Sequence, residues 1–544
     1  MATGEGTAPA AGGAGAIAGP PAEWRRLDRR SLLVTGAVMS GVAGGVCLPL
    51  LLGLASGGWF GDGPGRETAL ALLVTAGVLL VAGSVAADYA NWRRTRYRIG
   101  SERVDLHSGL LLLKRRSLAR ERIRSVDLTA HPLLRLLGLV KVRIGTGESG
   151  GAESSLELNP VSRVEGDRIR AELLDRPADP AAAPHGGVLA RLDLRWIRYA
   201  PTSFLTLAVG SAAFGAVLQV SDWFGVQQEL IGWTGDRIRD HPVALVVPVL
   251  ALGTLVTGAV GALGLWTEMW WGYRLEREPG GVLRVRRGLF TTRSVSVEER
   301  RLRGVELVEP IGVRALGGAR VDAVATGLAE AESDRQADAR GLLPAVPRAV
   351  ADRVAALVLH EPRSPTSAPL IRHPRRARNR RLSWALAAAG VPAAALAVGG
   401  LWLTPVLLYI AAGYAAVALP SGVALALDAY RSLGHGIAGR YLLARSGTFS
   451  RRTVALQRTG IIGWTVTESL AQRRAGLITL TATTAAGAGG YAIHDADRGE
   501  GLAFADAAVP GLLRPFLTEL PGPDIRAIPE APAEPAAGDN PPGA

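Results

Sequence analysis

The fold is decided by a short stretch, RVDLHSGLLLLK at 103–114, which recurs as VLRVRRGLFTTR at 282–293 and as YLLARSGTFSRR at 441–452. In the first two stretches apolar residues alternate with polar ones as the chain approaches a glycine, and in the third Tyr441-Leu442-Leu443 leads to Ser446-Gly447. A period of two is typical of a half-buried strand, and glycine adopts the positive φ that a tight turn requires. Each stretch therefore predicts a β-hairpin that turns at Gly109, Gly288 or Gly447.

Each stretch lies near the start of a longer β-rich segment, and we call these segments copy 1, copy 2 and copy 3. A second glycine follows twenty-nine residues after the first, at Gly138, Gly317 and Gly476. Further strands are predicted at 123–128, 139–145, 302–308, 319–325, 461–466 and 477–483. A helix is expected to close each copy, after Asn159-Pro160, at 348–359 and near 506–520. We interpret all six glycines as structural turn residues.

Pairs of apolar segments precede each copy. About 20 apolar residues are needed to cross ~30 Å of hydrocarbon, and six segments meet or approach that length. They are roughly Ser31–Ala55, Thr68–Ala87, Thr202–Val220, Val243–Trp266, Leu382–Ala397 and Pro405–Leu427. Each pair predicts one transmembrane hairpin. The interiors of these segments carry no charged residue or histidine, which argues against a coupled transporter or pump.

The distribution of arginine predicts the orientation. Arg25, Arg26, Arg29 and Arg30 precede the first span, and a run from Arg372 to Arg381 precedes the fifth. The opposite loops at 57–67 and 221–241 are poor in positive charge. Because positively charged loops stay in the cytoplasm, we expect both termini and all three copies to be cytoplasmic in a multi-pass plasma-membrane protein.

Composition narrows the function. The net charge is +13, yet Lys114 and Lys141 are the only lysines. An Arg-, Ala- and Gly-rich chain reflects a GC-rich genome better than nucleic-acid binding, since no basic motif with interleaved aromatic residues is present. Cys47 is the single cysteine and lies in an apolar segment, which excludes disulfides within the chain and cysteine-rich zinc sites.

The sequence lacks the Gly-rich loop ending in Gly-Lys-Ser/Thr that binds nucleotide phosphates. The compact cluster His494-Asp495-Ala496-Asp497 could ligate a metal, but we interpret it as a solvated polar loop. We therefore expect no catalytic residue, no cofactor and no metal site, and we do not expect an enzyme.

Two apolar spans, an aromatic and basic exit, several strands and a closing helix resemble the bacterial pleckstrin-homology (PH) domain membrane proteins. The tandem arrangement resembles the YdbT-like members, over about residues 24–520. Copy 1, with Tyr97-Arg98-Ile99, fits best and copy 2 nearly as well, whereas copy 3 departs at Gly434-His435-Gly436. The resemblance implies a small PH-like domain of two packed antiparallel sheets and a C-terminal helix, and it implies neither catalysis nor phosphoinositide binding.

The expected organisation combines six α-helical spans with three small cytosolic PH-like β domains. Hairpins are expected at 24–91, 199–267 and 382–428, and PH-like domains at 92–176, 268–362 and 429–520. A linker at 177–198, a basic linker at 363–381 and disordered ends at 1–23 and 521–544 complete the chain.

We expect a non-enzymatic scaffold that binds membrane lipids and either an unidentified protein or further copies of itself. Anionic-lipid sensing through the basic hairpins is one alternative, and a permease or enzyme of lipids or envelope precursors is another. The basic residue five positions past each turn glycine, with its neighbours, marks the candidate contacts: Lys114, Arg115, Arg116, Arg293, Arg451 and Arg452. The plainer interpretation, which we favour for these side chains, is a solvated strand face.

Overall fold

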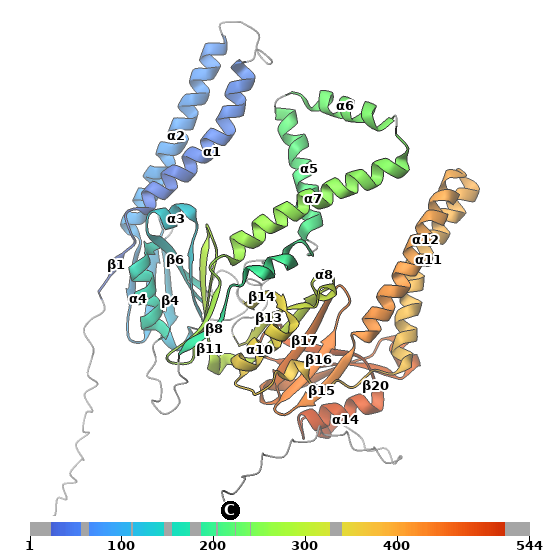
Figure 1. Ribbon diagram of the computed structural model, residues 1–544. Coiled ribbons are helices and arrows are strands. Elements are labelled where there is room, and N and C mark those ends of the chain that lie inside the picture. The colour runs from blue at the N-terminus through green and yellow to red at the C-terminus, as the bar shows by residue number, and fades with distance from the viewer. Residues whose placement is uncertain are drawn as a thin grey trace, which may run out of the picture.

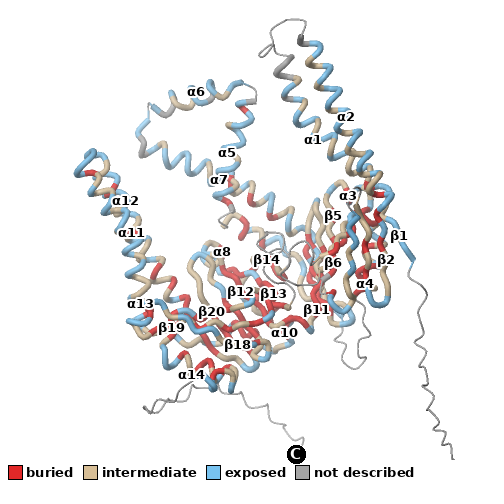
Figure 2. The backbone as a smooth tube through the Cα atoms, turned by 180° about the vertical axis from the view of Figure 1, so that it is seen from behind, coloured by how far each residue is buried: buried red, intermediate tan, exposed pale blue. Residues whose placement is uncertain are grey.

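A computed structural model describes residues 23–55, 65–109, 113–123, 125–145, 155–174, 186–202, 205–223, 225–239, 241–326 and 340–516. The strands form a continuous layer, and three pairs of long helices project from the same side of it (Figure 1). The helices are largely exposed, while the buried residues gather in the strand layer (Figure 2). Apart from Glu23, the ends expected to be disordered lie outside the described residues.

The helical pairs follow the predicted spans. They are α1 (Ser31–Ala55) with α2 (Gly65–Arg94), α5 (Leu205–Trp223) with α7 (Val243–Trp270), and α11 (Arg375–Trp402) with α12 (Val406–Arg431). A further helix, α6 (Gln227–Arg239), connects α5 to α7. Among the described residues five helices are long and apolar enough to cross a membrane.

The third predicted span differs from expectation. Helix α5 alone is not long and apolar enough to cross a membrane. A sixth span results only if α5 is joined to η2 (Leu194–Thr202) across a bend of 70°. Pro201 lies at this bend, and the Thr206 hydroxyl donates to its carbonyl oxygen over 2.9 Å. Because proline cannot donate a backbone hydrogen bond, a break in the helix at this point is expected.

The strands form four antiparallel sheets in the described part of the chain. The four-stranded sheet contains β1 (Arg25–Arg26), β2 (Arg96–Ile99), β3 (Arg103–Ser108) and β4 (Lys114–Ala119). The seven-stranded sheet contains β5 (Ser125–Ala130), β6 (Leu139–Gly145), β7 (Ser155–Ser162), β8 (Gly187–Arg191), β9 (Arg274–Glu278), β10 (Val282–Arg287) and β11 (Thr292–Glu298). The six-stranded sheet contains β12 (Leu302–Pro310), β13 (Gly318–Ala325), β14 (Gly341–Pro347), β15 (Gly434–Ala438), β16 (Tyr441–Ser446) and β17 (Ser450–Gln457). The three-stranded sheet contains β18 (Ile461–Thr467), β19 (Leu477–Thr484) and β20 (Gly490–Asp497).

Two of these sheets run through more than one copy, which differs from the expectation of two separate sheets in each. In the seven-stranded sheet β5 of copy 1 pairs with β11 of copy 2, and in the six-stranded sheet β12 of copy 2 pairs with β17 of copy 3. An edge strand leaves backbone N–H and C=O groups unpaired, and the next copy supplies partners for them. The hydrophobic core is shared only between copies 2 and 3 among the described residues, since Tyr441, Leu443 and Ala455 of copy 3 pack into the core of copy 2, whereas copy 1 has a core of its own.

The turn glycines have the backbone geometry that requires glycine. Gly109, Gly288 and Gly447 have φ of 124°, 112° and 103°, and Gly138, Gly317 and Gly476 have φ of 70°, 68° and 64°. The first three are hairpin turns, and the second three end the short helices α3 (Pro132–Leu136), α8 (Ile311–Ala315) and α13 (Leu470–Ala475).

The closing helices are α4 (Arg163–Leu174), α10 (Arg348–Leu359) and α14 (Arg498–Ala508). The second lies where the sequence predicts it. The third was predicted near 506–520 and instead begins at Arg498, where the Asp497 side chain accepts hydrogen bonds from the backbone N–H groups of Gly499 and Glu500. The first begins after Pro160, which is still part of β7.

Both predicted linkers contain regular structure. In 177–198, β8 adds to the seven-stranded sheet beside β9. In 363–381, the basic residues from Arg375 onward form the first turns of α11, so that this helix extends beyond the predicted span. The remaining short helices are η1 (Arg120–Arg122), η3 (Glu299–Arg301), η4 (Pro365–Ser367), η5 (Arg458–Gly460) and η6 (Arg514–Phe516).

Candidate functional site

The six candidate contact residues lie on β4, β11 and β17, which belong to three different sheets. Lys114 and Arg115 are exposed on β4, and Arg116 is half-buried and donates to the Ser155 carbonyl oxygen over 3.3 Å. Strand β4 is the edge of its sheet. The structure therefore does not gather the six residues into one basic surface.

The equivalent residues of copies 2 and 3 lie at the junctions between copies. Arg293 in β11 lies opposite Thr129 of copy 1. Arg452 in β17 lies opposite Val308 of copy 2, and its side chain pairs with Glu306 over 3.4 Å. Arg451 pairs with Asp428 over 3.5 Å and donates to the Ser432 hydroxyl over 2.9 Å. Much of this basic charge is thus engaged within the chain.

The two junctions have the same register. Arg293 and Arg452 each follow their own turn glycine by five residues, and they lie opposite Thr129 and Val308. These two residues each follow the turn glycine of the preceding copy, Gly109 or Gly288, by twenty residues. One rule of strand pairing therefore joins copy 1 to copy 2 and copy 2 to copy 3.

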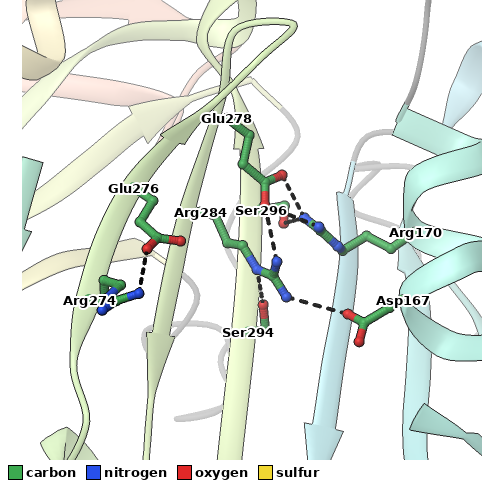
Figure 3. A network of polar contacts seen from close by, with 8 residues as sticks. All are labelled: Asp167, Arg170, Arg274, Glu276, Glu278, Arg284, Ser294 and Ser296. Carbon is green, nitrogen blue, oxygen red and sulfur yellow. Dashed lines mark hydrogen bonds and ion pairs between the residues drawn. The ribbon is translucent and has the colours of Figure 1, made fainter. Parts of the chain in front are cut away.

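A polar network crosses the first junction (Figure 3). Arg170 in α4 of copy 1 reaches Glu278 of copy 2 with distances of 2.9 and 3.1 Å, and it contacts the Ser296 hydroxyl at 3.2 Å. From copy 2, Arg284 pairs with Glu278 at 3.0 Å and with Asp167 of copy 1 at 3.4 Å. Burial raises the pKa of Glu278, but hydrogen bonds and charge from Arg170 and Arg284 outweigh it and lower the pKa overall.

Beside this network lies a pocket of about 400 Å³ between copies 1 and 2. It is lined by seven arginines and by Asp167; the arginines are Arg135, Arg163, Arg274, Arg284, Arg286, Arg287 and Arg293. Burial, followed by the charges of Arg284 and Arg163, lowers the pKa of Arg286. Concentrated positive charge of this kind attracts an anion. Trp271 and Gly272, which follow α7 directly, also line the pocket, so it lies where the chain leaves the helical hairpin.

Sequence reasoning missed this pocket and the network, because both are assembled from two copies. A signal was present in copy 2, where Arg284 and Arg286 alternate with the buried Leu283 and Val285 of β10. A strand face with only arginines needs acidic or anionic neighbours.

The cluster at 494–497 is not a solvated loop. It forms the end of β20, and Asp495 is 1% exposed. Its carboxylate pairs with Arg380 and Arg381 of α11, the second at 3.1 Å, and accepts from Gln472 Nε2 over 2.9 Å. Sequence reasoning did not assign 490–497 to a strand, and the cluster attaches the third hairpin to copy 3. In the described part of the chain no group of three or more His, Cys, Asp or Glu side chains could hold a metal ion.

Two histidines extend this cluster. His373 Nδ1 lies 3.1 Å from the Asp495 carbonyl oxygen, and His435 Nδ1 lies 3.0 Å from His373 Nε2. Burial lowers the pKa of His373, and burial together with the neighbouring His373 lowers the pKa of His435 to about 3. Both imidazole rings are therefore uncharged, and both are buried where the third hairpin attaches to copy 3.

Comparison with known proteins finds similarity in two regions of the chain. The model of the bacterial PH domain matches residues 47–177 and 383–510, which contain copies 1 and 3. Copy 3, which fits the family resemblance least well by sequence, thus lies in a matched region. The UPF0699 transmembrane protein YdbT of Bacillus subtilis (strain 168) is 31% identical over 105 residues, 19% of this chain and 21% of that protein. The match thus spans about a fifth of that relative's length.

No solved structure matches the chain. The matched regions each contain strands of the layer and at least one of the long apolar helices. The chain therefore carries two regions that match the bacterial PH domain, together with helices long and apolar enough to cross a membrane.

Proposed function

We propose that the chain is a non-enzymatic scaffold of the plasma membrane, which presents three PH-like copies to the cytosol and binds proteins there, further copies of itself included. The observation that carries the proposal is the common register of the two junctions. Adding a strand to a sheet edge is a general mode of protein recognition, because the backbone hydrogen bonds supply affinity and alternate side chains supply specificity.

The charged groups support binding rather than catalysis. Arg170, Glu278 and Arg284 are engaged with one another across the first junction, and Arg452 with Glu306 across the second. These ion pairs fix how neighbouring copies are held. Charge used in this way gives specificity to an interface.

Photo-crosslinking in native membranes tests the scaffold. A benzophenone amino acid would replace Ser117 in β4 or Thr465 in β18, which are exposed edge-strand residues, and Arg353, exposed on α10, would serve as the matched control. We expect discrete protein adducts from the two edge positions. Adducts no more abundant there than at Arg353 would contradict the proposal.

The arginine-lined pocket favours a second candidate, the binding of an anionic lipid headgroup. Each basic group near an anionic leaflet gains ~1 kcal/mol, an attraction that salt screens. Seven arginines line this pocket, and Asp167 is the one acidic residue among its described lining residues.

The test is the amount of phosphatidylglycerol that stays bound to the detergent-purified full chain. The double variant Arg163→Gln, Arg286→Gln should retain less than the wild type, and the loss should be greatest at low salt. The variant Arg353→Gln removes an exposed charge elsewhere and should retain as much as the wild type. Equal retention by all three proteins would remove the lipid candidate.

A further inference from the structure

Among the edge strands of the described part of the chain, two are equivalent to strands that join neighbouring copies. Strand β4 ends the four-stranded sheet, and β18 ends the three-stranded sheet. In position along its copy β4 is equivalent to β11 and β17, which pair with the preceding copy. In the same way β18 is equivalent to β5 and β12, which pair with the following copy. The open edges are therefore the two halves of the junction that the chain already forms twice.

The exposure of these edges differs from that of their equivalents. Thr465, Val466 and Thr467 of β18 are all exposed, whereas the equivalent residues of β12 are all buried, namely Glu306, Leu307 and Val308. On β4, Ser117 is exposed, whereas the equivalent residues Ser296 and Ala455 are buried. Each open edge thus exposes to solvent the strand positions that are buried where two copies pair.

A glycine in β18 gives independent evidence. Gly304 in β12 lies so close to copy 3 that a Cβ added there would be 1.9 Å from the Ala455 carbonyl oxygen. Gly463 is equivalent, since both follow their turn glycine by sixteen residues and both follow a shift of register in their strand. A Cβ at Gly463 would meet nothing within 4 Å. Strand β18 therefore shares with β12 the glycine that lies against the neighbouring strand at the second junction, while no described residue occupies that place beside Gly463. At the first junction the equivalent residue is Ser125, and the described pairing there covers only residues 128–130 of β5.

We propose that β18 of one molecule pairs with β4 of a second, in the register of the internal junctions. That register places Thr467 opposite Lys114 and Gly463 opposite Leu118. The three helical pairs project from one side of the strand layer, so successive molecules can share one membrane (Figure 1). A head-to-tail contact of this kind is heterologous, and it gives a closed ring or an open array in the plane of the bilayer.

This inference rests on the proposed scaffold function and names its partner as a second copy of the chain. Edge recognition by an unrelated protein, or by residues 517–544 of the same molecule, is the competing occupancy. A cysteine test separates these possibilities.

Two differently tagged full-length chains, both carrying Cys47→Ser, would be co-expressed, one with Thr467→Cys and the other with Lys114→Cys. Directly opposite residues of an antiparallel pair have Cα atoms about 4.5–5.5 Å apart, which is within the range that a disulfide spans, so mild oxidation of membranes can form one. We expect the heterodimer and neither homodimer. Pairing Thr467→Cys with Arg115→Cys moves the register by one residue and turns the two side chains to opposite faces, so it should give little product.

A second measurement uses the glycine. Gly463→Val should leave the melting temperature of the full chain unchanged, because its side chain meets nothing, and it should abolish the Thr467–Lys114 heterodimer. Absence of the heterodimer in folded wild-type background, or its persistence with Gly463→Val, overturns the inference. If the heterodimer is absent while Ser117 and Thr465 still crosslink to another protein, the inference fails and the proposed scaffold function stands.

Discussion

Gly304 of β12 lies directly against Ala455 of β17, with room for a hydrogen but none for a methyl group, since a Cβ at 304 would stand 1.9 Å from the Ala455 carbonyl oxygen. The two residues belong to different copies of the repeat. Close approach of their backbones is what allows the six-stranded sheet to pass from copy 2 into copy 3.

Replacing Gly304 with valine should force the two strands apart. Overpacking at a buried site costs about 1–3 kcal/mol, and separated strands would lose ladder hydrogen bonds in addition. The measurement is the melting temperature of the detergent-purified full chain. Gly187→Val in β8 is a matched control, because a Cβ there meets nothing within 4 Å. Equal melting of the two variants would show that β12 and β17 are not in contact.

Arg170→Met should destabilise the junction between copies 1 and 2. The Arg170 side chain is 10% exposed and Glu278 is 27% exposed, so the carboxylate would lose a partner in a poorly solvated place. We expect a loss of about 1–3 kcal/mol in the free energy of unfolding, reduced from a fully buried pair by the remaining solvent and by Arg284. Arg168→Met, exposed on the same helix, should be near neutral in the same denaturant titration. A loss as large for Arg168 would assign the effect to helix α4 rather than to the ion pair.

The stability of the third hairpin's attachment should fall as pH falls below neutral. Burial, with His373 beside it, lowers the pKa of His435 to about 3, whereas an unfolded histidine titrates near 6.5. Between these values the unfolded chain binds more protons, so stability is full above about pH 6.5 and declines by at most ~1.4 kcal/mol per pH unit for this group. Burial raises the pKa of Asp127 in copy 1 to about 7, which acts in the opposite direction, so the measurement is a difference. From pH 7.5 to 5 the melting temperature of the wild type should fall relative to that of His435→Gln.

All three copies should lie on the cytoplasmic side of the membrane. In a Cys47→Ser background, single cysteines at Ser101, Arg353 and Arg474 probe exposed positions in copies 1, 2 and 3. A membrane-impermeant maleimide added to intact cells should label none of them, and it should label a cysteine at Thr404, between α11 and α12. Labelling of any of the three while Thr404→Cys stays unlabelled would reverse the orientation.

Local features of this fold could be predicted from the sequence because local rules decide them. Apolar length predicted most of the long helices, and a glycine after alternating residues predicted hairpins whose turns have positive φ. Pro347 marked the start of α10 correctly. Copy 3 was harder, because Gly499 and Gly501 weaken the helical pattern of α14 that follows Asp497.

Pairing between copies could not be predicted in this way. Alternation shows which face of a strand is buried, but it does not show which strand lies at the edge. The residues that pair at the first junction, Thr129 and Arg293, are far apart in the sequence. The arginine-lined pocket depends on that pairing, because neither copy alone contains all of its walls.

Very little chain separates the helices from the strands that follow them. A single residue, Thr95, lies between α2 and β2, and Ser432 and Leu433 alone lie between α12 and β15. The strand layer consequently has no tether on which to swing away from the bilayer. Because the strand layer is fixed close to the helices, it cannot move far into the cytosol. A binding partner therefore has to come close to the lipid surface.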